Sequence, residues 1–210
     1  MKASVITLHT VDNYGSVMQT YATQQILKKC GCDVEFIDYW RRDNLPESRA
    51  EKMLEGSTLQ KLKPLWGANK FTHRATVSIL KIVLEKKKSP MWKFLQERVN
   101  LTKSRYCSYD QLKANPPLAD IYITGSDQVW NSIWNKGIDL AYFLDFAPAG
   151  KPRIAFSASI GREQLNEEEI PETKHLLEKY NAISVREQSA VEILASMDIK
   201  STLVLDPTLM

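Results

Sequence analysis

Short apolar runs alternate with segments of helical periodicity along most of the chain, and this alternation constrains the fold more than any other feature. An apolar run at residues 3–8 leads through a polar loop into a helical pattern at 17–30, and a second strand pattern follows at 33–39. Gly31 stands where a glycine usually ends a helix. These residues therefore predict one βαβ unit.

The same alternation returns in the second half of the sequence. We predict strands at 120–124, 153–157, 182–185 and 202–205, and helices at 167–180 and 187–197. Alternating strands and helices are expected of a parallel sheet with helices on its faces. The sequence therefore predicts an α/β fold, in which a Rossmann-like parallel sheet carries helices on both faces.

An insertion at about residues 41–105 interrupts this pattern. Proline and glycine among charged residues predict a loop-rich stretch over 41–75 with room for one short helix. Periodicity then predicts helices at 76–87 and 90–100. We accordingly interpret residues 1–210 as one Rossmann-like domain with a helical insertion.

The insertion also carries most of the positive charge. Residues 60–105 hold twelve Lys or Arg against Glu85 and Glu97, a local charge of +10. The plainer interpretation is a solvated helical face, and the alternative is docking onto anionic lipid head groups or a pyrophosphate-linked substrate. No recognised nucleic-acid motif accompanies the charge, so nucleic acid is not an expected partner.

The composition fits a globular protein, because 43% of the residues are apolar and 25% are charged. No apolar run reaches the ~18 to 20 residues that cross a bilayer, and the N-terminus lacks a signal-peptide pattern. We therefore expect a cytoplasmic protein, and its expected positions include the inner face of the plasma membrane. The cysteines and histidines show no metal-ligand spacing, so no metal site is predicted.

Ligands of open parallel sheets bind beyond the carboxyl ends of the strands, so the polar loops after the predicted strands are the candidate sites. The first loop, residues 9–16, precedes a helix whose free N–H groups favour an anion. Gly15 allows a ligand to approach the backbone. Asn13 and Ser16 are binding candidates, with simple helix capping as the equal alternative.

The second loop, residues 125–131, is unusually rich in polar side chains around Asp127. Trp130 and Trp134 can stack on the apolar face of a sugar while Asp127 accepts bonds from its hydroxyls. The alternative is that Asp127 caps a helix and both tryptophans lie in the core. The remaining candidates in this loop are Gly125, Ser126, Gln128 and Asn131.

Two further loops complete the candidate site. Small residues at Ser157, Ser159 and Gly161 indicate a close approach, either of a ligand or of a neighbouring helix. Arg186 and Glu187 follow the next predicted strand. Arg186 is a candidate clamp for an anionic group, but we favour an internal ion pair with a carboxylate that starts the following helix.

Five motifs in order resemble the polysaccharide pyruvyl transferase family. They are Asp12-Asn-Tyr-Gly-Ser-Val-Met-Gln-Thr-Tyr-Ala22, Gly125-Ser-Asp-Gln-Val-Trp-Asn131, Ser157-Ala-Ser-Ile-Gly161, Ser184-Val-Arg-Glu187 and Asp206-Pro-Thr208. They span nearly the whole chain. The first motif adds Tyr14 and Gln19 to the candidate binding residues.

The resemblance implies a two-domain architecture similar to the double-Rossmann glycosyltransferases, with this chain as the first half. The resemblance also implies that a second domain supplies much of the cationic binding for phosphoenolpyruvate, so this chain alone is expected to lack full activity. The implied reaction moves the pyruvyl group of phosphoenolpyruvate onto two hydroxyls of one sugar, in a cell-surface polysaccharide or its precursor, as a cyclic ketal. No cofactor is implied.

Within this chain, our hypothesis is that Asp127 positions or deprotonates the acceptor hydroxyl, with His9 as a weaker acid or base candidate. The expected partners are phosphoenolpyruvate and a saccharide acceptor, lipid-linked acceptors included, with membrane contact through residues 60–105. A nucleotide-sugar glycosyltransferase fits the predicted fold equally well, because fold does not fix chemistry. A non-catalytic saccharide-binding module is the third interpretation.

Overall fold

The computed structural model describes residues 1–11, 13–41, 44–56, 69–86 and 90–210. Seven strands of these residues form one parallel sheet, in the order β3-β2-β1-β4-β5-β6-β7. The strands are β1 (Lys2–Ile6), β2 (Asp33–Tyr39), β3 (Leu101–Tyr106), β4 (Ile121–Thr124), β5 (Arg153–Ala158), β6 (Ala182–Val185) and β7 (Thr202–Leu203). The predicted Rossmann-like α/β arrangement is confirmed, since this strand order is the Rossmann order with one strand added.

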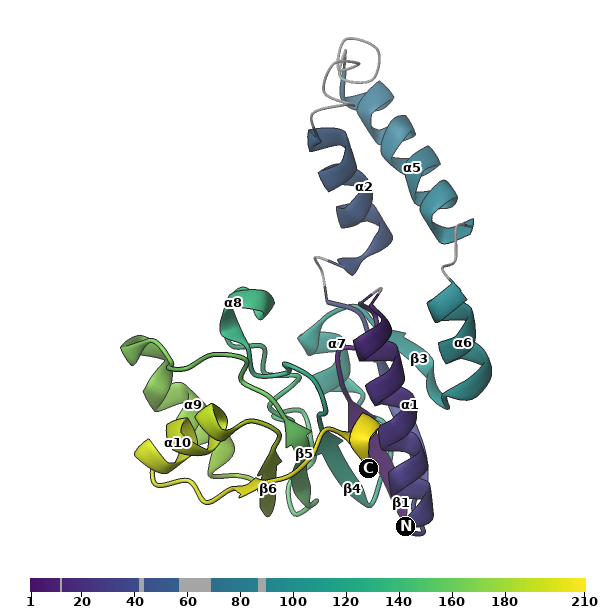
Figure 1. The fold of residues 1–210 in the computed structure, drawn as a ribbon. Coiled ribbons are helices and arrows are strands. Elements are labelled where there is room, and N and C mark those ends of the chain that lie inside the picture. The colour runs from purple at the N-terminus through teal and green to yellow at the C-terminus, as the bar shows by residue number, and fades with distance from the viewer. Residues whose placement is uncertain (12, 42–43, 57–68, 87–89) are drawn as a thin grey trace.

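Helices cover both faces of the sheet (Figure 1). They are α1 (Tyr14–Lys29), α2 (Pro46–Glu55), α5 (Lys70–Lys86), α6 (Pro90–Arg98), α7 (Tyr109–Ala114), α8 (Ser132–Asn135), α9 (Ile170–Leu177) and α10 (Gln188–Ser196), with 3-10 turns η2 (Glu167–Glu169) and η3 (Pro207–Leu209).

Alternate residues of the central strands belong to two separate apolar clusters, one on each face of the sheet. Val5 and Phe36 face α1 and α6, whereas Ile6 and Ile37 face the side that carries α7, α9 and α10. Successive side chains of a strand point to opposite faces, so a strand that is buried on both sides reads as a continuous apolar run. This explains why the central strands could be predicted from the sequence.

The insertion holds more regular structure than the sequence indicated. The short helix expected within 41–75 is α2, and α5 begins at Lys70 because Asn69 accepts bonds from the N–H groups of Phe71 and Thr72. The strand β3 and the helix α7 were not predicted. Helices α2 and α5 pack against each other and extend together away from the sheet (Figure 1). We call this pair of helices the arm.

Candidate functional site

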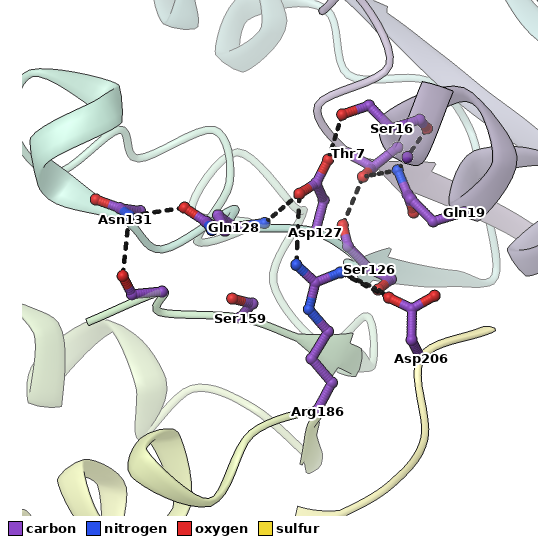
Figure 2. A network of polar contacts seen from close by, with 12 residues as sticks. Thr7, Ser16, Gln19, Ser126, Asp127, Gln128, Asn131, Ser159, Arg186 and Asp206 are labelled. Atoms are coloured by element: carbon purple, nitrogen blue, oxygen red, sulfur yellow. Dashed lines mark hydrogen bonds and ion pairs between the residues drawn. The ribbon is translucent and has the colours of Figure 1, made fainter. Parts of the chain in front are cut away.

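The carboxyl ends of β1 and β4 lie side by side, although the chain leaves them in opposite directions along the sheet. Such a reversal opens a crevice, and ligands of doubly wound sheets bind there. The loops that follow β1, β4, β5 and β6 meet at this point, together with the start of α1. Figure 2 shows the resulting polar network, which we call the switch-point network: Thr7, Ser16, Gln19, Ser126, Asp127, Gln128, Asn131, Ser159, Arg186 and Asp206.

Asp127 lies at the centre of this network and is partly exposed. Its Oδ2 accepts a 2.6 Å hydrogen bond from Ser16 Oγ at the start of α1. Its Oδ1 accepts a 2.8 Å hydrogen bond from the backbone N–H of Gln128. Its backbone has φ 82° and forms a parallel bridge to Ala158. The end of β5 therefore holds the Asp127 backbone, while α1 orients the Asp127 carboxylate.

Gly125 allows this loop to pass close to β5. A Cβ atom at residue 125 would lie 2.3 Å from the carbonyl oxygen of Phe156, and the backbone φ is +107°. Glycine is the only residue that fits both conditions. Its neighbour Ser126 is buried and follows a cis peptide bond, and its carbonyl accepts from Thr7 Oγ1 at 2.6 Å. The ends of β1 and β4 are therefore joined by side chains as well as by the sheet.

Arg186 is surrounded by three carboxylates. Its guanidinium lies 2.6 Å from Asp206 Oδ2, 3.6 Å from Asp127 Oδ1 and 3.7 Å from Glu187 Oε2. The internal ion pair with Glu187 that we favoured is present, and the pair with Asp206 is closer. A single cation among three anions leaves a negative local balance, so Arg186 in this arrangement does not serve as a free clamp for an anionic substrate.

The pKa of Asp206 reflects two opposing effects. Burial raises the pKa of this carboxyl, but hydrogen bonds from Thr208 and Arg186 and the charge of Arg186 outweigh burial, so the pKa lies below its ordinary value. Asp206 belongs to the last of the five motifs, but the sequence did not identify it as a site residue. It follows the last strand, and η3 then carries the chain back to contact α1 (Figure 1).

Glu187 organises the loop after β5. Its Oε1 accepts from Ser159 Oγ at 2.7 Å and from the N–H groups of Ile160 and Gly161 at 2.9 and 2.8 Å. Ser157 is buried and donates to the Leu205 carbonyl at 3.0 Å. These contacts favour a structural role for Glu187, Ser157 and Ser159 over direct contact with a ligand, which was one of the two interpretations of this loop.

The start of α1 combines capping with site geometry. Asn13 is the N-cap and accepts from Gly15 N at 2.7 Å, which is the capping alternative, whereas Ser16 lies inside the helix and bonds to Asp127 instead. Gln19 is buried and donates to Thr7 Oγ1 at 3.0 Å. Tyr14 is exposed. Thr7 was missed by the sequence reasoning because it lay within a predicted strand.

The two tryptophans after β4 have opposite environments. Trp130 is 3% exposed, stacks on Phe143 and meets the edge of Tyr180, so its predicted role as a platform for a sugar is wrong and it belongs to the core. Trp134 is 69% exposed on α8, and Asn131 caps this helix. Trp134 therefore offers the open aromatic face.

A hollow of about 660 Å³ begins at Asn135, the neighbour of Trp134 in sequence, and lies between α2 and the loops that follow β2, β3 and α8. Asn135 joins it to the Asp127 loop, because its amide donates to the Val129 carbonyl at 2.8 Å. The lining includes Tyr39, Arg41, Glu51, Tyr109, Asn135 and Asp139. Rings, carboxylates and amides of this kind suit a polyhydroxylated ligand.

His9 is not placed in the crevice. Its ring is 1% exposed, lies 3.2 Å from Asp38 Oδ1 through Nε2, and stacks on Trp92 at a centroid distance of 6.3 Å. Burial raises the pKa of Asp38, but His9 and Arg105 outweigh it and hold that pKa below its usual value. His9 is therefore not placed to act as an acid or base in the crevice. Its burial fits a structural pair with Asp38.

The described residues bear on two kinds of partner, metal ions and membranes. Within the described ranges, no group of three or more His, Cys, Asp or Glu side chains has the arrangement needed to hold a metal ion. No helix among those same residues is both long enough and apolar enough to span a membrane.

Comparison with known proteins gave one match. A search of curated proteins and a search of solved structures each found no significant match. A family model described as polysaccharide pyruvyl transferase matches residues 13–210, which include every member of the switch-point network except Thr7. The chain therefore belongs to the polysaccharide pyruvyl transferase family.

Proposed function

We propose that this transferase moves the pyruvyl group of phosphoenolpyruvate onto two hydroxyls of one sugar residue in a cell-surface polysaccharide or its precursor. C3 of the enol gains a proton, and the two sugar oxygens bond to C2 while the bond from C2 to the phosphate oxygen breaks. The two hydroxyl protons balance the proton gained at C3 and the one that leaves on phosphate. The products are a cyclic ketal and inorganic phosphate.

The observation that carries the proposal is the Asp127 carboxylate, partly exposed at the point where the strand order reverses. Ser16 Oγ lies 2.6 Å from its Oδ2, so an alcohol oxygen fits there at hydrogen-bond distance. A carboxylate has about four acceptor sites, so a sugar hydroxyl beside Ser16 can also donate to Asp127 and pass its proton to Asp127 as it attacks C2. Asp127 is thus proposed as the base for the acceptor.

The donor needs positive groups for its carboxylate and phosphate. Because three carboxylates surround Arg186, we assign those groups elsewhere. One is the N-terminus of α1, which adjoins Asp127 through Ser16 and carries the positive end of a helix dipole. The others belong, on this proposal, to a second domain across the crevice.

The acceptor saccharide is proposed to lie along Trp134 and the adjoining hollow. The exposed indole provides an apolar face for one sugar ring, and the hollow continues from Asn135 with side chains that exchange hydrogen bonds with hydroxyls. This arrangement extends away from Asp127 along α8. It leaves the α1 side of the crevice for the donor.

The test is phosphate release from phosphoenolpyruvate by the complete natural protein with a pyruvylatable acceptor. Asp127→Asn should lower turnover by about 100-fold or more, the contribution typical of a general base. Asp120→Asn is the matched control, because Asp120 is an exposed carboxylate at the amino end of β4, whereas Asp127 follows the carboxyl end of that strand. Normal turnover of Asp127→Asn would exclude the catalytic role. Calorimetric binding of a nucleotide sugar without any response to phosphoenolpyruvate would exclude the donor.

A further inference from the structure

We propose that the outer face of α5 docks onto an anionic lipid bilayer. The inner face of this helix packs against α2 within the arm. The opposite face is exposed along Lys70, Phe71, Arg74, Ala75, Ser78, Ile79 and Ile82. These positions recur at intervals of three and four residues, so they form one continuous stripe along the helix.

Large apolar side chains occupy three of the seven positions of this exposed stripe. Phe71 is 82% exposed, Ile79 is 62% exposed and Ile82 is 51% exposed. Single exposed apolar residues are common on protein surfaces, but three in line on one helix mark an interaction surface. Among the described residues this face stays exposed, because α2 packs against the other, half-buried side of α5.

The charges beside the stripe identify the partner. Lys70 and Arg74 are exposed along one flank of the apolar residues, whereas Lys81 pairs with Glu47 of α2. Lys70, His73 and Arg74 also line a hollow of about 430 Å³ near the start of α5. An apolar face flanked by cations is the pattern of a helix that lies in a membrane interface, with its cations at the phosphates.

The position of the arm gives this docking a consequence for the site. The arm follows the carboxyl end of β2, and Asp127 follows the carboxyl end of β4. Both therefore lie at the same end of the parallel strands (Figure 1). Docking would hold the domain at the bilayer surface, where an acceptor carried on a lipid is found, with α2 between the docked face of α5 and the hollow beside α8 (Figure 1). The docking itself does not depend on the proposed reaction, and its test measures binding alone.

The experiment is co-sedimentation of the complete natural protein with vesicles of phosphatidylcholine, or of phosphatidylcholine with 30% phosphatidylglycerol (a composition of about one-third anionic lipid). We expect binding to the anionic vesicles only, weakening as salt rises. Phe71→Gln and Ile82→Gln should each reduce partitioning by about tenfold, the loss expected when one such side chain no longer enters hydrocarbon. The double variant Lys70→Gln with Arg74→Gln should lose about fivefold per charge.

Leu118→Gln is the control, because Leu118 is an equally exposed apolar residue outside the arm. It should bind like the unsubstituted protein, and circular dichroism should show that all variants keep their helices. The proposal is overturned if the natural protein ignores anionic vesicles, or if Phe71→Gln binds them as well as the control does. It is also overturned if light scattering shows a dimer that Phe71→Gln dissociates, since a second copy would then cover the stripe.

Discussion

Replacing Arg186 by methionine removes one cation from among three carboxylates and keeps most of the side-chain length. Asp206 lies 2.6 Å from the guanidinium, and Asp127 and Glu187 lie within 3.7 Å. Removing one partner of a fully buried ion pair costs about 3 to 5 kcal/mol, because the other charge stays buried. Arg186 and Asp206 are partly exposed, so we expect a loss of about 2 to 3 kcal/mol in the free energy of unfolding at pH 7.

The pH dependence provides a sharper test of the same substitution. The folded-state pKa of Asp206 is lowered, so its stabilisation is present above the unfolded pKa of about 3.9 and is lost as pH falls through the folded pKa. Without Arg186, protonation instead relieves repulsion among the carboxylates. The difference in stability between the natural protein and Arg186→Met should therefore be largest near pH 7 and shrink toward pH 4.

Urea unfolding followed by tryptophan fluorescence measures both effects. Lys174→Met is the matched control, since Lys174 pairs with the exposed Asp198 at the surface and surface pairs contribute about 0 to 1 kcal/mol. If Arg186→Met resembles this control at pH 7, or if its effect does not change with pH, Arg186 is not the counter-ion of the cluster and the electrostatic account of the site is wrong.

Three other substitutions test separate parts of the structure by the same unfolding assay. Gly161→Ala should destabilise by more than Gly31→Ala, because both residues have positive φ but only at Gly161 would the new methyl group meet a facing side chain, at 2.6 Å. Trp130→Ala should lose about 3 to 5 kcal/mol, and Trp134→Ala at most about 0.5 kcal/mol; equal losses would contradict their assigned environments. In Asp38→Asn, the free energy of unfolding should fall less steeply between about pH 5 and pH 3 than it does in the natural protein. The folded-state pKa of Asp38 is lowered, so the stability that its carboxylate contributes is lost as pH falls. An unchanged pH dependence in this range would argue against that contribution.

The fold was predictable wherever local periodicity and burial agree. The central strands are buried on both faces, and their apolar runs identified them. The strand β3 escaped prediction because it lies at the sheet edge and pairs only with β2 among the described strands. Its Lys103, Ser104 and Arg105 are exposed, and charged residues are typical of edge strands.

The site was predictable at the level of loops but not of individual contacts. The rule that ligands bind at the carboxyl ends of strands correctly brought the loops of Ser16, Asp127 and Arg186 together. The sequence could not show that Asp206 reaches Arg186, because that contact depends on the path of the chain after β7. Trp130 was misassigned for a similar reason, since the sequence does not reveal whether a loop residue turns inward.

The strand order also sets when the crevice can form during synthesis. The helix α1 and the strands β1 and β2 are contiguous in sequence, so they can assemble as soon as they leave the ribosome. Thr7 must wait for Ser126, 119 residues later, before the two sides of the crevice meet. The segment from the start of α2 to the end of α6, residues 46–98, occupies nearly half of that interval, yet doubling a loop adds only about 0.6 kcal/mol of closure entropy. This segment therefore delays the assembly of the crevice by the time that its own translation takes. It adds little to the entropy cost of folding the domain.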